Sequence, residues 1–181
     1  MDVDIFDENG SPINNAKGEL VCKTPFPSMP VKFWNDEGDK KYKSAYFEKY
    51  NNIWHHGDFA KITNNGGFVI FGRSDTTLNP GGVRLGTAEI YNVVEKFNEI
   101  QESIVIGQSW KNDIRIILFV VLNAGYNLSD EIKDKIKKAI KSHASPRHVP
   151  SKIISVSEIP KTKNGKLVEL AVKQTVEGEE I

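Results

Sequence analysis

The chain has 181 residues, enough for one medium domain or two small ones. Its 24 basic residues (Lys and Arg) balance its 24 acidic ones, so no net field draws it toward nucleic acid or an anionic membrane. We therefore expect neither as a partner. The single cysteine, Cys22, excludes an internal disulfide and suggests no metal site, which favours a reducing, cytoplasmic setting.

The longest apolar run, Ile116 to Leu122, is far shorter than the ~20 residues that a membrane-spanning helix needs, and it is predicted to be a buried strand. The first residues, Met1 to Asp4, carry acids where a signal peptide would carry positive charge. We expect a protein that stays in the compartment where it is made.

Residues 1–74 are predicted to form a small β-rich unit, a meander or barrel, with turn signals between the strands. The clearest signal is Asn65-Gly66, a strong cue for a β-hairpin. Three prolines between residues 24 and 30 predict a loop or an edge. The expected strands are Val3 to Phe6, Glu19 to Lys23, Phe59 to Thr63 and Phe68 to Phe71.

Residues 75–181 show a different pattern, which predicts a compact α+β domain with a short sheet and about three helices. Apolar residues at helical spacing indicate helices over Thr87 to Phe97, with Thr87 as N-cap, and over Ser129 to Ala144. The remaining expected elements are strands over Ser103 to Ile106, Ile114 to Leu122 and Ile153 to Val156, and a last helix over Leu167 to Val176. The apolar character of the second strand favours the middle of the sheet.

Three segments contain residues that could bind a ligand or take part in catalysis. The first is Trp54-His55-His56-Gly57-Asp58. A carboxylate after a glycine at a strand edge can accept hydrogen bonds from the two hydroxyls of a ribose. Judged from these five residues alone, a turn aspartate without function is the better interpretation. Because neighbouring strand residues point to opposite faces, the two histidines are not expected to share a metal ion.

The second segment runs from Gly72 to Ile90, where Arg73 and Arg84 flank a glycine-rich loop that leads into a helix. Such a loop offers charge-assisted donors for phosphate oxygens, and its glycines let a substrate approach the backbone. A domain linker before a capped helix needs the same glycines, so both interpretations remain open.

The third segment, Pro160-Lys161-Thr162-Lys163-Asn164-Gly165-Lys166, is a lysine-rich turn. A lysine on a glycine-containing loop can bring positive charge to a transition state in which negative charge develops on phosphate. Most turns of this composition are only solvated surface.

Taken together and in this order, the three segments resemble the late motifs of the adenylate-forming enzymes, a superfamily that includes acyl-CoA synthetases, peptide synthetase adenylation domains and firefly luciferase. Within it, Leu78-Asn79 and Arg84 to Glu89 are similar to acetyl-CoA and acetoacetyl-CoA synthetases. Segments such as Phe33-Trp34-Asn35-Asp36-Glu37 and Pro146-Arg147-His148-Val149-Pro150 are similar to the acetoacetyl-CoA synthetases in particular.

The resemblance implies roles for individual residues. Asp58 would bind the ribose hydroxyls of ATP, and Arg73 would contact ribose and phosphate. Asp75 would be the hinge on which the C-terminal domain swings between two catalytic poses. The other implied residues are Arg84 facing phosphate, Gly82 beside the channel for the pantetheine arm, Lys166 as the catalytic lysine of adenylation, and Lys141 near the coenzyme A nucleotide.

The same resemblance implies that residues 1–74 are the last subdomain of a large adenylating domain and residues 75–181 the mobile C-terminal domain. ATP, Mg²⁺ and coenzyme A would serve the whole ligase, with an N-terminal adenylating domain as partner and an acid as substrate. The family's aromatic-Arg-Thr-Gly-Asp motif reads Trp54-His55-His56-Gly57-Asp58 here, so the aspartate is kept and the threonine is not.

This sequence has no Ser/Thr/Gly-rich loop followed by lysine, the family's motif for ATP phosphates. We therefore expect this chain alone to make no acyl-adenylate. Two alternatives stand beside acetoacetate ligation: a ligase for another short-chain acid, and a non-catalytic binding or regulatory module with the same fold. The second has no chemical need for Asp58, Arg73, Asp75, Arg84 and Lys166 together.

Overall fold

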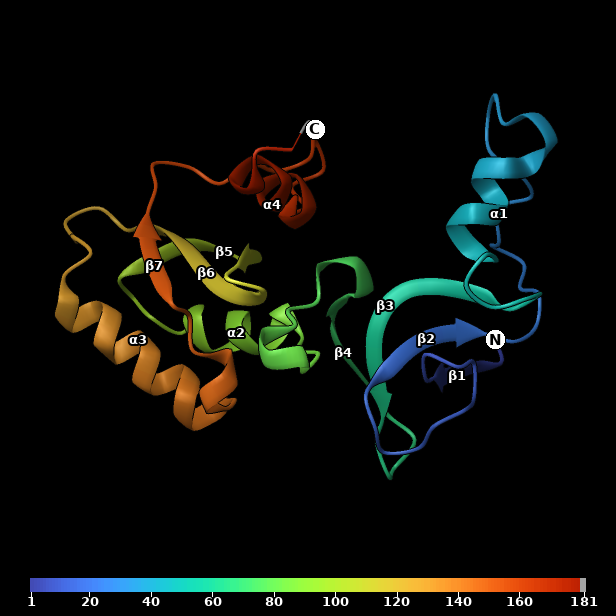
Figure 1. Ribbon diagram of the computed structural model, residues 1–181, viewed down its shortest axis with the longest axis horizontal. Helices are drawn as coiled ribbons and strands as arrows, with labels where there is room; N and C mark the ends of the chain where they lie inside the picture. Colours follow the sequence, from blue (N-terminus) through green and yellow to red (C-terminus); the bar gives the residue numbers. More distant parts are fainter. Residues whose placement is uncertain (180–181) are drawn as a thin grey trace. The chain divides into compact units, whose positions relative to one another are not determined.

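The computed structural model describes residues 1–179, and the chain divides into two compact units, Met1–Ser74 and Asp75–Ile181 (Figure 1). A short 3₁₀ turn, Ser74–Thr76, contains the boundary between them. The fold is α+β, as the sequence predicts, with a four-stranded sheet in the first unit and a three-stranded sheet in the second. Among the helices of residues 1–179, none has the length and apolar character needed to cross a bilayer.

The first unit is an antiparallel meander in which each strand pairs with the next one along the chain. Thr63 and Gly67 close the last hairpin through a backbone hydrogen bond, and Gly66 takes a φ of +78°, as the Asn65-Gly66 cue predicts. The strands are β1 (Val3–Phe6), β2 (Gly18–Cys22), β3 (Trp54–Ile62) and β4 (Phe68–Arg73).

A helix that the sequence analysis did not predict, α1 (Lys40–Tyr46), follows a 3₁₀ turn over Glu37–Asp39. The carboxylate of Asp36 accepts hydrogen bonds from the backbone N–H groups of Lys41 and Tyr42 at 2.9 and 2.8 Å. The ring of Tyr46 stacks on Trp54 of β3 with centroids 3.8 Å apart. Aromatic packing onto β3 thus stabilises a helix too short to be stable by itself.

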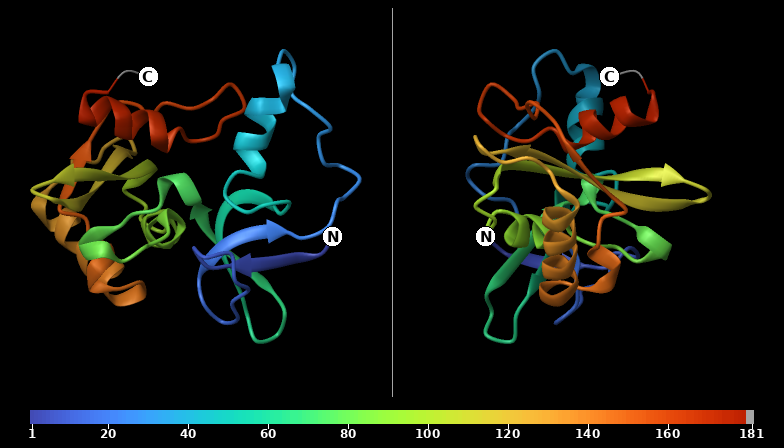
Figure 2. Two further views of the ribbon diagram at one scale, coloured as in Figure 1. Left: turned by 45° about the vertical axis from the view of Figure 1, so that its right-hand side comes forward. Right: turned by 90° about the vertical axis from the view of Figure 1, so that its left-hand side faces the viewer.

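The second unit is a three-stranded sheet in the order β5-β6-β7, with β6 in the middle as its apolar sequence predicts. Strands β5 and β6 are antiparallel, and β6 and β7 are parallel. Helices α2 and α3 lie on one face of the sheet and α4 on the other (Figures 1 and 2). The elements are α2 (Thr87–Val94), β5 (Ile100–Trp110), β6 (Asp113–Leu122), α3 (Asp130–His143), β7 (Lys152–Ser155) and α4 (Glu169–Glu177).

The core of the second unit joins α2, α3 and the sheet through fully buried apolar side chains such as Ile90, Leu118, Ile136 and Ile140. Helix α3 begins as predicted, because Ser129 is its N-cap and accepts a hydrogen bond from the N–H of Ile132. The predicted cap of α2 is wrong by one residue. Its N-cap is Gly86, whose N–H donates to the Glu89 carboxylate, and Thr87 is the first residue of the helix.

Candidate functional site

Asp58 and Arg73 lie directly opposite each other on neighbouring strands, because the register of β3 and β4 pairs them. Arg73 Nη1 lies 3.6 Å from Asp58 Oδ1 and donates to the carbonyl of His56 at 3.3 Å. Gly57 makes room for this arrangement. A Cβ added to Gly57 would lie 2.7 Å from a guanidinium nitrogen of Arg73, and its φ of +81° also favours glycine.

The two histidines of this strand have different partners. His56 Nδ1 lies 2.5 Å from Asp58 Oδ2, so this exposed imidazole orients the carboxylate. His55 Nε2 lies 3.0 Å from a carboxylate oxygen of Glu19, on the other face of the strand. An Asp carboxylate has about four lone-pair sites, so Asp58 keeps acceptor capacity for the hydroxyl groups of a ligand.

Glu19 is a site residue that the sequence analysis missed, a carboxylate that is 1% exposed in β2. Lys49 Nζ donates to Glu19 Oε1 at 2.6 Å, and the hydroxyl of Ser74 donates to Oε2. The buried carboxylate therefore has a cationic partner and a neutral hydrogen-bond donor. Without such partners, burying a charge is energetically costly. One of them, Ser74, immediately precedes Asp75. A lone acid within an otherwise apolar strand was the available signal for this network.

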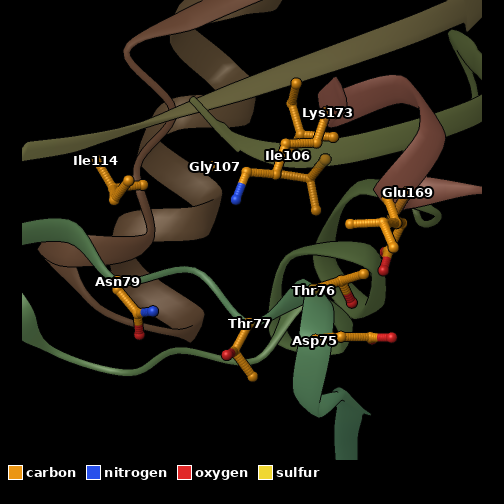
Figure 3. A pocket seen from close by; sticks show the side chains of 11 residues that line it. Asp75, Thr76, Thr77, Asn79, Ile106, Gly107, Ile114, Glu169 and Lys173 are labelled. Atoms are coloured by element: carbon orange, nitrogen blue, oxygen red, sulfur yellow. The ribbon is translucent and has the colours of Figure 1, made fainter. Parts of the chain in front are cut away.

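Asp75 lies in the 3₁₀ turn at the start of the second unit and lines a pocket within that unit (Figure 3). In this view Asp75, Thr76 and Thr77 lie on one side of the pocket, and Glu169 and Lys173 of α4 on the other. Gly107 and Ile114 of the sheet complete the wall. The predicted hinge residue thus borders the helix that follows the lysine-rich turn.

Arg84 and Gly82 lie on one loop, which is closed by paired backbone hydrogen bonds between Leu78 and Leu85 of 2.9 and 2.7 Å. Arg84 Nε donates to the hydroxyl of Thr77 at 3.1 Å, which orients the guanidinium. Gly82 has a φ of +74°, and a Cβ added there would meet no atom of residues 1–179 within 4 Å, its two chain neighbours aside. The loop therefore presents open backbone of the kind that a narrow ligand arm can approach.

Asp113, at the start of β6, holds this loop in place. Its Oδ1 accepts a hydrogen bond from the backbone N–H of Gly81 at 2.8 Å. That bond, followed by a second from the N–H of Ile114, lowers the pKa of the Asp113 carboxyl below its ordinary value. Gly81 itself has a φ of +59°, so the anchor secures a backbone conformation that few residues adopt.

Replacing Asp113 is expected to disturb the Gly81-Gly82 turn selectively. Under the roles that the resemblance implies, Asp113→Ala in a complete ligase should slow thioester formation from supplied acyl-adenylate roughly tenfold, because small misplacements near a reacting group are costly. Adenylation should stay within about twofold of wild type, since Lys166 lies on a different loop. The matched control is Asp113→Asn, which keeps an oxygen acceptor for the Gly81 N–H. An equal loss in both half-reactions would contradict this role.

Lys166 is exposed on a closed turn over residues 161–167. The carbonyl of Lys166 accepts a hydrogen bond from the N–H of Thr162 at 2.9 Å, and its own N–H donates to Thr162 Oγ1 at 3.1 Å. Gly165 has a φ of +78°, which explains the glycine of this turn. The backbone of the turn is therefore ordered, while the Lys166 ammonium group is presented to solvent.

Lys141 lies in the last turn of α3, where a cation interacts favourably with the helix dipole. It belongs to a different element from the loops of Gly82 and Lys166, and its side chain is exposed. The structure therefore brings Asp58 and Arg73 together in one unit and gathers Gly82 and Arg84 on one loop of the other.

Comparisons with known proteins show which families the chain is similar to. Residues 89–166 match the family described as AMP-binding enzyme C-terminal domain. Over 98% of its length the chain superposes on an acetoacetyl-CoA synthetase from Streptomyces lividans with a TM-score of 0.92 and 45% identity, covering 26% of that chain. An anthranilate CoA ligase, AuaEII, shares the fold with a TM-score of 0.83 at 20% identity. Residues 89–166 therefore match the C-terminal domain of AMP-binding enzymes, and the chain is similar to the corresponding part of an acetoacetyl-CoA synthetase.

Within that class, its sequence is similar over nearly its whole length to acetoacetyl-CoA synthetases. It is 57% identical over 97% of its length to the protein from Rhizobium meliloti, and 46% identical over its full length to the protein from Gallus gallus. In both cases the chain spans 27% of the relative, about a quarter of its length. The resemblance inferred from the late motifs is confirmed.

Proposed function

We propose that this chain is the C-terminal part of an ATP-dependent acetoacetate–CoA ligase of two units: residues 1–74, the end of the large adenylating domain, and residues 75–181, the mobile C-terminal domain. In the first half-reaction the acid attacks the α-phosphate of ATP and releases pyrophosphate. In the second, the thiol of coenzyme A displaces AMP from the acyl-adenylate. The proposal draws on the Asp58–Arg73 pair, in a chain whose relatives carry the name acetoacetyl-CoA synthetase.

The residues of the first unit fit a nucleotide. A carboxylate that keeps free lone pairs can accept both hydroxyl groups of a ribose, and a guanidinium 3.6 Å away can donate to a phosphate oxygen. The missing side chain at Gly57 is what allows the guanidinium to lie against the strand. Asp58 and Arg73 thus supply the acceptor and the donor that an adenylate requires.

The second unit supplies groups for both half-reactions. Lys166 offers positive charge where pyrophosphate leaves, and Mg²⁺ held with the ATP phosphates would share that role. Gly82 offers the open backbone beside which the pantetheine arm of coenzyme A would pass, with Arg84 directed to phosphate and Lys141 to the coenzyme A nucleotide. Rotation of the backbone at Asp75 would move the Lys166 loop away from the reacting groups and bring the Gly82 loop to them.

The N-terminal adenylating domain is the partner that the proposal requires, because the family resemblance implies that the acid pocket belongs to that domain. A cytoplasmic setting is supported by the lone Cys22, which is buried and forms no disulfide in the part of the chain that the structure describes.

Acid-dependent exchange of pyrophosphate into ATP by the complete ligase tests the substrate. Acetoacetate should support exchange with a kcat/KM at least tenfold higher than acetate or butyrate, because a site built to bind a keto oxygen is left unpaired by an acid that lacks it. Equal exchange with all three acids would leave the ligase chemistry in place and reject acetoacetate as the preferred substrate.

A further inference from the structure

The turn that carries Lys166 is anchored to the rest of the unit at both ends. At its start, Lys161 Nζ lies 2.6 Å from a carboxylate oxygen of Glu102 in β5. After it, Glu169 in the first turn of α4 accepts a hydrogen bond from the hydroxyl of Tyr91 in α2 at 2.5 Å. Only Leu167 and Val168 separate Lys166 from Glu169, so the position of the Glu169 side chain limits where the Lys166 backbone can lie.

The Tyr91 hydroxyl has a fixed orientation. It accepts a hydrogen bond from the backbone N–H of Val105 in β5 at 3.1 Å, so its own proton is directed to the Glu169 carboxylate. Burial, and then the charge of Glu169, raise the pKa of Tyr91 well above its ordinary value. The hydroxyl therefore remains a donor at every pH at which the enzyme would work, and it links α2, β5 and α4 at one point.

We infer that Tyr91 and Glu169 are a positioning pair that holds Lys166 for adenylation. Neither side chain touches the reacting atoms in this inference, and both act through the backbone between Lys166 and Glu169. A lysine that must stabilise charge on a departing group needs a defined location, because roughly 1 Å of misplacement can cost about 100-fold in rate. The inference rests on the proposed role of Lys166 and adds two residues to it.

A second bond of the same kind provides a matched control. At the other end of α4, Glu177 accepts a hydrogen bond from the backbone N–H of Ser109 in β5 at 2.8 Å. Glu169 and Glu177 both fasten α4 through a carboxylate, but Glu177 lies at the end remote from Lys166. If the Tyr91–Glu169 bond merely docks the helix, loss of either carboxylate should have the same consequence.

The two half-reactions are measured separately in the complete ligase. Tyr91→Phe and Glu169→Ala should each slow pyrophosphate exchange about tenfold or more through kcat, with thioester formation from supplied acyl-adenylate within about twofold of wild type. Glu169→Gln keeps an acceptor for the Tyr91 hydroxyl and should restore most of the exchange rate, whereas Glu177→Ala should leave it near wild type. Equal losses in Glu169→Ala and Glu177→Ala would overturn the inference.

Hydrogen exchange on the 181-residue chain gives a readout that needs no substrate. Tyr91→Phe should speed exchange of the Thr162 and Lys166 amides, which are bonded within the turn, and Glu177→Ala should not. Unchanged exchange at both amides in Tyr91→Phe would overturn the inference even in an active ligase. If the amides respond as expected while acetoacetate supports no pyrophosphate exchange, the positioning pair stands and the proposed acid is rejected.

Discussion

Lys166→Ala is expected to slow adenylation by about 100- to 1,000-fold in the complete ligase, the usual cost of removing one preorganised group that stabilises developing charge. Thioester formation from supplied acyl-adenylate should stay within about twofold of wild type, because pyrophosphate has already left. Pyrophosphate exchange and single-turnover thioester formation measure the two steps separately.

The control for this substitution is Lys163→Ala, which removes a lysine from the same turn. That variant should keep both half-reactions, since the role is assigned to one ammonium group and not to the net charge of the turn. A loss of similar size in both variants, or an equal loss in both half-reactions of Lys166→Ala, would contradict the assignment.

Asp75→Pro is expected to separate the half-reactions in another way. Proline fixes φ near −65° and restricts the preceding Ser74, so the backbone at the unit boundary loses the rotation that a hinge requires. One half-reaction should fall by about 100-fold while the other is retained, since a locked chain can present only one of the two loops. The same two assays report the result.

Asp75→Ala is the matched variant, because it removes the carboxylate and leaves the backbone free to rotate. It should retain both half-reactions within about threefold if the position acts through its backbone. Unchanged rates in Asp75→Pro would contradict the assignment of the hinge to Asp75. An equal loss in both half-reactions would indicate general damage to the turn.

Local patterns predicted the elements whose stability is decided locally. Helix α3 follows from its apolar face and the Ser129 cap, and β6 follows from an apolar run long enough to lie in the middle of a sheet. Helix α1 was not predicted, because its stability comes from the stacking of Tyr46 on Trp54, a contact made only after the chain folds. The ends of β5 likewise depend on pairing with β6 and extend beyond the predicted Ser103 to Ile106.

Some residues of the candidate site could also be predicted from local sequence, and others could not. Asp58, Arg73 and Lys166 lie in compact motifs and could be selected from the sequence. Tyr91 could not, because its partner Glu169 is 78 positions away along the chain. The bond between Asp113 and Gly81 spans 32 positions and gives no local signal. Both contacts exist because β5 and β6 bring distant segments together, so only the folded chain reveals them.

The most direct test of the account is AMP release with acetoacetate, ATP, Mg²⁺ and coenzyme A, first for this chain alone and then for its mixture with the N-terminal portion of the same ligase. We predict no AMP from the chain alone and sustained, acetoacetate-dependent release from the mixture. Sustained AMP release by the chain alone would contradict the proposal that adenylation requires the N-terminal portion. No release by a mixture that forms a stable complex would contradict the ligase function and favour a non-catalytic module.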